Sequence, residues 1–174
     1  MNSLLFSNII RFIALVLLQV LICNQMNFLG SINPYIYILF ILIYPVKNNR
    51  LSFILISFVL GILIDIFMDT GGAHAAASVT IAYMWPLFFK FSFGAAYEYQ
   101  AIKFNDADLL PRVIYFTLLI LIHHFILFIL IIFDNSKAGM VVSNALSTGL
   151  FTLFLALTLT TLFSRKEKWE SYYF

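Results

Sequence analysis

Long apolar stretches separated by short polar turns fill most of the sequence. A helix needs about 20 mostly apolar residues to cross the hydrocarbon core of a bilayer, and several stretches approach that length. Only 10% of the residues are charged and 63% are hydrophobic, whereas ordinary soluble domains carry roughly 25% charged residues. The pattern excludes a soluble globular domain and predicts an all-α membrane protein, with one polytopic domain over residues 1–174.

Six stretches are expected to cross the membrane. The expected spans are 9–26, 34–46, 51–68, 73–93, 111–133 and 140–163. The second is short and bounded by Pro34 and Pro45, so we expect it to be tilted, extended by its flanks or partly re-entrant. The second and fifth spans are rich in Ile, Leu and Phe, which makes them candidates for contact with lipid or with a partner's helix.

The basic residues predict the orientation of the chain. With six spans, nine of the ten Lys and Arg residues fall on one side and Lys137 alone falls on the other. The nine are Arg11, Lys47, Arg50, Lys90, Lys103, Arg112, Arg165, Lys166 and Lys168. Because Lys and Arg concentrate in cytoplasmic loops, both termini are predicted to be cytoplasmic. The net charge of +2 is too small to favour binding to nucleic acid.

A carboxylate inside the third span is the most informative polar group. Asp65 would cost about 2.5–3.5 kcal/mol there on insertion scales, and Asp69 follows one turn later on the same helix face. One interpretation is a site for an ion, a proton or a polar ligand, with His74 as a third member. In the other interpretation Asp69 is solvated at the headgroups and Asp65 caps or hydrogen-bonds a neighbouring helix. The candidate polar or packing site comprises Gly61, Asp65, Asp69, Gly71 and His74.

The pair His123-His124 lies in the middle of the fifth span. Consecutive helical residues point about 100° apart, so we expect the two rings to face different neighbours and to have a structural role. Zinc normally needs three or four ligands, and the single cysteine, Cys23, cannot form an internal disulfide. The sequence also has no phosphate-binding loop and no HExxH or GxSxG motif. It therefore predicts a protein that is not an enzyme and holds no metal or cofactor.

Small residues recur every four positions on the fourth and sixth spans. Such rows let helix backbones approach closely in lipid, and we expect most of them to serve packing within the bundle, with partner docking as the alternative. The rows are Ala73 and Ala77, Gly72 and Ala76, Ala145 and Gly149, and Gly139, Ser143 and Ser147.

The segment GILIDIFMDTGGAHAAASVTIAY, residues 61–83, resembles the signature region of the MreD family of bacterial rod shape-determining membrane proteins. Gly61 and Asp65 near a span end, a glycine-containing turn and a helix rich in small residues follow one another in the family's order. Upstream, the segment LLQVLICNQMNFLGSINPYIYILFILIYP is similar to the first two spans of the family.

The resemblance implies a small, multi-pass protein of the bacterial inner membrane without catalytic activity, and a fold similar to the S components of energy-coupling-factor vitamin transporters. It implies a scaffold of the cell-wall elongation complex. The implied partners are membrane lipid, an MreC-like protein, an MreB-like filament, and a RodA-type glycosyltransferase with its transpeptidase. An alternative is a solute-binding subunit of a vitamin transporter, which Asp65, Asp69 and His74 on the outer side favour. The first span of such subunits often carries an alanine at every fourth position. Here the residue four positions after Ala14 is Leu18, which weakens this alternative.

Overall fold

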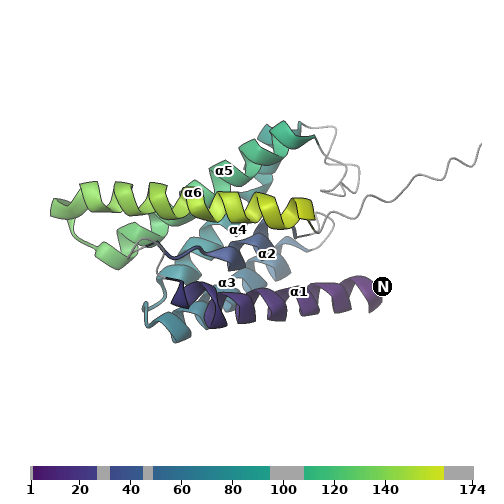
Figure 1. Cartoon of the computed structure of the whole chain (residues 1–174). Coiled ribbons are helices and arrows are strands. Elements are labelled where there is room, and N and C mark those ends of the chain that lie inside the picture. The colour runs from purple at the N-terminus through teal and green to yellow at the C-terminus, as the bar shows by residue number, and fades with distance from the viewer. Residues whose placement is uncertain (1, 27–31, 45–48, 95–107, 163–174) are drawn as a thin grey trace, which may run out of the picture.

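The computed structural model describes residues 2–26, 32–44, 49–94 and 108–162. The elements in these ranges are helices (Figure 1), which confirms the predicted all-α class. They are α1 (Asn2–Leu21), η1 (Cys23–Gln25), η2 (Ile36–Ile38), α2 (Leu39–Leu42), α3 (Arg50–Met68), α4 (Ala73–Phe93), α5 (Leu109–Ile132), η4 (Asn135–Lys137) and α6 (Ala138–Leu162).

Four of the helical stretches described are long and apolar enough to cross a membrane. They are Phe6–Gln25, Arg50–Met68, Leu109–Ile132 and Asn135–Leu162, and they correspond to the first, third, fifth and sixth expected spans. α4 has 21 residues, which is long enough, but it is less apolar because it carries polar residues such as His74 and Lys90. The chain thus contains at least four helices suited to a membrane.

Helices α3, α4, α5 and α6 pack against one another in chain order. Short turns join α3 to α4 and α5 to α6, and short connections place consecutive helices side by side as antiparallel neighbours. α1 packs against α3, η2 and α2 and lies at the edge of the bundle (Figure 1). Large apolar side chains such as Ile13, Phe58 and Leu150 are exposed on the outer faces of α1, α3 and α6, as expected for surfaces that face lipid.

The second expected span is not a continuous helix. Residues 33–35 are not helical, and seven helical residues follow in η2 and α2. Every residue from Tyr35 to Leu42 is buried, and the stretch contacts α1, α4 and α6. The expectation that this span contacts lipid was therefore wrong. α5, the other candidate for contact with lipid, packs between α4 and α6, and 44% of its most apolar stretch is buried. We call residues 34–44 the broken segment; residues 45 and 46 of the expected span lie outside the described ranges.

Gln19 of α1 bonds the backbone of the broken segment. Its Nε2 donates to the carbonyl of Pro34 at 3.1 Å and to the side chain of Asn24 at 2.9 Å, while its Oε1 accepts from the N–H of Tyr37 at 3.3 Å. Gln19 is fully buried. Non-helical backbone is tolerated at membrane depth only where protein or a water-filled cavity surrounds it, so Gln19 supplies bonds that the segment cannot make internally.

Two further helices complete the bonding of this segment. Thr152 of α6 accepts from the N–H of Tyr35 at 3.1 Å, and Tyr115 of α5 donates to the carbonyl of Leu42 at 3.1 Å. Polar side chains from three helices therefore converge on one irregular stretch of chain. They explain why buried polar residues occur in helices that are otherwise apolar.

The rows of small residues divide between the interior and the surface. Gly149 lies close to α5, where a Cβ on Gly149 would stand 3.5 Å from Leu121 Cδ2. Four row members are buried: Ala73, Ala77, Ala145 and Gly149. Three others are exposed: Ala76, Gly139 and Ser143. One of the two rows on each helix thus serves internal packing, which is half of the rows where most were expected to do so.

Replacing Gln19 by leucine is expected to destabilise the fold, because leucine keeps the volume but leaves the Pro34 carbonyl and the Tyr37 N–H buried without a partner. Each such group costs about 1–3 kcal/mol, so the free energy of unfolding should fall by about 2–5 kcal/mol. Denaturant titration of the full chain in micelles, followed by circular dichroism, measures this. Gln25→Leu at an exposed position is the control; an equal loss in both variants would contradict the assignment.

Candidate functional site

The carboxylate of Asp65 caps the beginning of α4 from the last turn of α3. Its Oδ1 accepts from the N–H of His74 and its Oδ2 accepts from the N–H of Ala75, both at 2.9 Å. The first amides of a helix lack partners within the helix, and a side chain at the N-cap usually supplies one. Here the N-cap is Gly72, which has no side chain to do so. Asp65 takes that role across two helices.

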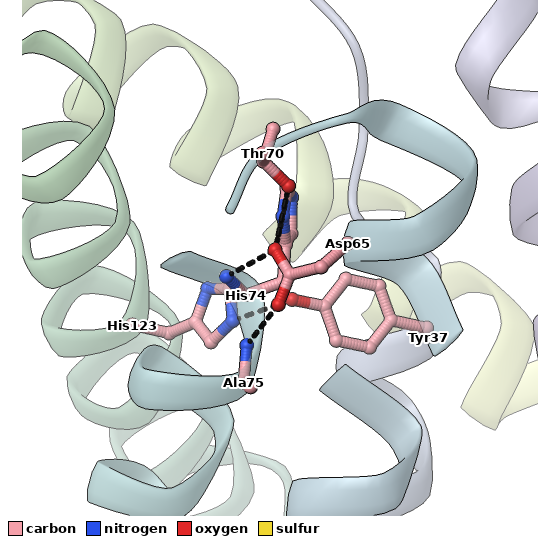
Figure 2. A network of polar contacts seen from close by, with 6 residues as sticks. All are labelled: Tyr37, Asp65, Thr70, His74, Ala75 and His123. Atoms are coloured by element: carbon pink, nitrogen blue, oxygen red, sulfur yellow. Dashed lines mark hydrogen bonds and ion pairs between the residues drawn. The ribbon is translucent and has the colours of Figure 1, made fainter. Parts of the chain in front are cut away.

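The same carboxylate bonds two side chains. The hydroxyl of Thr70 donates to Asp65 Oδ1 at 2.5 Å, and His74 Nδ1 lies 3.1 Å from that oxygen and 2.9 Å from Thr70 Oγ1. Figure 2 shows the carboxylate bracketed by Thr70 and the start of α4. Asp65 is 5% exposed and His74 is fully buried. We call Asp65, Thr70, His74 and Ala75 the Asp65 cluster; its bonds offset the desolvation of a buried carboxylate.

Gly61 sets the distance between α3 and α4. A Cβ at this position would overlap the Cα of Ala75 and stand 2.6 Å from its backbone N and 2.7 Å from the carbonyl oxygen of His74. The two backbones therefore touch one turn before Asp65. This close approach brings the carboxylate within hydrogen-bond distance of the amides of α4, so Gly61 and Asp65 act as one unit.

Asp69 and Gly71 lie apart from this unit. Asp69 ends α3 in the left-handed region (φ 53°), its N–H donates to the carbonyl of Asp65, and its side chain is exposed. Gly71 is also left-handed (φ 61°) and exposed. Of the five predicted site residues, the structure brings together Gly61, Asp65 and His74 and places the other two in the turn. This geometry matches the second interpretation, in which Asp65 caps a neighbouring helix.

The two histidines of α5 face different neighbours, as expected. His123 Nε2 lies 2.7 Å from the hydroxyl oxygen of Tyr37. His124 Nδ1 lies 2.7 Å from the carbonyl of Ile120, and its Nε2 lies 3.2 Å from Thr152 Oγ1. Both rings are fully buried, so neither faces lipid.

Two tyrosines of the broken segment connect these histidines to the Asp65 cluster. The ring centroid of Tyr35 lies 5.2 Å from that of His74 and 5.5 Å from that of His124. The ring of Tyr37 lies 5.9 Å from His74 and 5.6 Å from His123. All three histidines of the chain thus surround one pair of tyrosines, in contact with their rings.

Two nitrogens of this interior have no hydrogen-bond partner among the described residues, His74 Nε2 and His123 Nδ1. The described ranges hold no group of three or more His, Cys, Asp or Glu residues arranged for a metal. The side chains of the polar interior cap a helix and bond irregular backbone.

Sequence reasoning did not identify Thr70 or Tyr37 as members of this interior. Thr70 follows Asp65 by five residues in the turn, so a predicted helix end at Asp69 could have indicated its position. Tyr37 and His123 are 86 residues apart, and nothing local in the sequence pairs them.

Comparisons of the chain with protein-family models, with curated proteins and with solved structures found no match.

Substitution of Gly61 by alanine should separate α3 from α4, because the new methyl group would meet backbone atoms, which cannot rotate away. Overpacking of this kind costs about 1–3 kcal/mol. Gly149→Ala is the matched control, since its Cβ would make only ordinary van der Waals contact and alanine favours a helix by about 1 kcal/mol over glycine. Thermal unfolding in micelles should show a lower midpoint for the first variant only. A stable Gly61→Ala protein would disprove the backbone contact.

Asp65→Asn should loosen the start of α4, since an asparagine side chain has one acceptor oxygen for the two amides. The amide left over costs about 1–3 kcal/mol of unfolding free energy, and hydrogen exchange at residues 73–77 should become faster. Asp69→Asn provides the control, because asparagine tolerates the left-handed conformation and Asp69 is exposed. Mass spectrometry of exchanged peptides gives the comparison; equal protection in both variants would refute the capping role.

Proposed function

We propose that the protein is a non-catalytic scaffold of the MreD type, which holds partners of the cell-wall elongation complex together in the bacterial inner membrane. The observation that carries this proposal is how the interior uses its polar side chains. Gln19, Tyr115 and Thr152 bond the broken segment, and Asp65 caps α4. These hydrogen bonds fix the positions of the helices relative to one another within the membrane. A scaffold needs such a fixed surface to bind its partners.

The same proposal includes six crossings with both termini in the cytoplasm. α4 packs along both α3 and α5, and its 21 residues would extend about 31 Å at 1.5 Å per residue, enough to cross beside them. The broken segment gains length from its non-helical residues, since extended backbone rises about 3.3 Å per residue. Six crossings also put nine of the ten basic residues on the cytoplasmic side.

The proposed partners are membrane proteins that bind the apolar outer faces of the bundle, with an MreC-like protein and a RodA-type synthase as the leading candidates. The first apolar stretch, Phe6–Gln25, has the most exposed surface of the four, because only 11% of its most apolar 18 residues are buried. The solute-binding alternative receives less support, because the rings of Tyr35, Tyr37 and the three histidines pack against one another in the interior. The proposal for an MreD-type scaffold also includes a fold similar to that of the S components of energy-coupling-factor transporters.

Depletion of the protein from a rod-shaped host tests the scaffold role. Cells should widen and become round as wall synthesis loses its spatial organisation, and the wild-type gene and the Asp69→Asn variant should both restore rods. Light microscopy of cell width and labelling of new peptidoglycan supply the measurements. Normal width and labelling after depletion would overturn the proposal. If the purified protein also retained a small solute in native mass spectrometry, the transporter alternative would replace it.

A further inference from the structure

We propose that Arg112 and the first turn of α5 bind a phosphate group, carried by an anionic lipid or free in solution. The site lies at the end of the bundle where α3 begins, α4 ends and α5 begins. The inference depends on the geometry of this end alone, and it holds or fails independently of the scaffold role.

Arg112 is a buried arginine that lacks a counter-charge among the described residues. Its side chain is 7% exposed, and its Nε is buried with no hydrogen-bond partner. Two of the described carboxylates form ion pairs elsewhere, Asp65 with His74 and Asp134 with Lys137. A guanidinium group stays charged in a protein and carries several N–H donors, and a buried charge without a partner is strongly unfavourable. A bound anion would remove this penalty.

Helix geometry sets the direction of the Arg112 side chain. Arg112 precedes Tyr115 and Phe116 by three and four residues, so it shares their helix face, and both of these aromatic side chains are fully buried. The ring centroids of Tyr115 and Phe93 lie 5.6 Å apart, which places this face of α5 against the last turn of α4. Long helical side chains point back toward the N-terminus of their helix. The guanidinium group is therefore directed toward the first turn of α5.

The first turn of α5 offers further donors to an anion. The first amides of a helix have no partner within the helix, and the helix dipole is positive at this end. In α5 these amides belong to Leu109 and Leu110, and the side chain of the N-cap residue, Asp108, caps neither of them. The oxygens of a phosphate match the planar fork of an arginine, which can bond two of them at once. Arg112 and these amides can thus hold one phosphate together.

The surroundings of this end favour an anion and leave the first turn open. Arg50 at the start of α3 and Lys90 in the last turn of α4 are exposed basic residues, and Asp108 is the one described acidic residue nearby. Leu109 and Leu110 are 60% and 69% exposed, so an anion can reach the turn from outside the bundle. Basic sites between membrane helices bind lipid headgroups, and the exposed leucines would meet the acyl chains of such a lipid.

Thermal unfolding of the full chain in phosphate-free micelles of an uncharged detergent tests the proposal. Phosphatidylglycerol, added at about 100 times its dissociation constant, should raise the midpoint by about 5–10 °C. Phosphatidylcholine, whose headgroup carries its own cation, should raise it much less. Inorganic phosphate distinguishes the two sources: a rise as large as that with phosphatidylglycerol would identify free phosphate as the ligand, and no rise would identify the lipid.

Arg112→Met separates a ligand site from a structural role. Without added anion this variant should unfold at the same temperature as the wild type or higher, because an unpaired buried charge is gone and the side chain keeps most of its length. Phosphatidylglycerol should then no longer raise its midpoint. Arg50→Met is the control, since it removes an exposed arginine at the same end. Its midpoint should rise with phosphatidylglycerol nearly as much as that of the wild type, measured from its own lipid-free value.

A third variant decides if Arg112→Met does not fold. Arg112→Lys keeps the charge but loses the fork, so phosphatidylglycerol should raise its midpoint less than that of the wild type. Three results would overturn the proposal. They are a wild-type midpoint that neither phosphatidylglycerol nor phosphate raises, an equal rise with phosphatidylcholine, and a rise that the Arg112 variants share in full with the wild type.

Discussion

A backbone amide or carbonyl inside a bilayer has no water to bond, so each one needs a partner within the protein. A continuous helix meets this demand by itself, but a helix start and an irregular stretch do not. In this bundle both exceptions lie in the interior and both are met by side chains. Asp65 bonds two amides at the start of α4, and Gln19 bonds two backbone groups of the broken segment. The burial of Gln19, Asp65 and Thr152 follows from these two requirements.

The two exceptions also depend on each other. Tyr35 and Tyr37 of the broken segment pack on His74, the second residue of α4, and on the two histidines of α5. A displaced α4 would remove a ring from one side of these tyrosines, and a displaced broken segment would leave His74 without its aromatic neighbours. The interior therefore behaves as one cooperative unit, in which helix capping, ring packing and backbone bonding support the same arrangement.

The sequence predicted the apolar helices and part of the site for identifiable reasons. Spacing alone placed Gly61, Asp65 and His74 near one another, because a helix end and a glycine-rich turn separate them by few residues. It could not predict that the second span is broken, since a short apolar run looks alike whether it forms a helix or an extended, fully buried strand. Nor could it predict the pairing of Tyr37 with His123, which depends on how α5 packs against a segment 86 residues away.

The hydrogen bond between Tyr35 and Thr152 joins residues 117 positions apart, which bears on the order in which the protein is completed during synthesis. The broken segment leaves the ribosome well before α6, yet an acceptor for one of its amides belongs to α6. Until α6 is inserted, that amide lacks its partner, and the segment has only the bonds offered by α1 and α5. The broken segment is thus synthesised before α6 but becomes fully bonded only after α6 has been inserted.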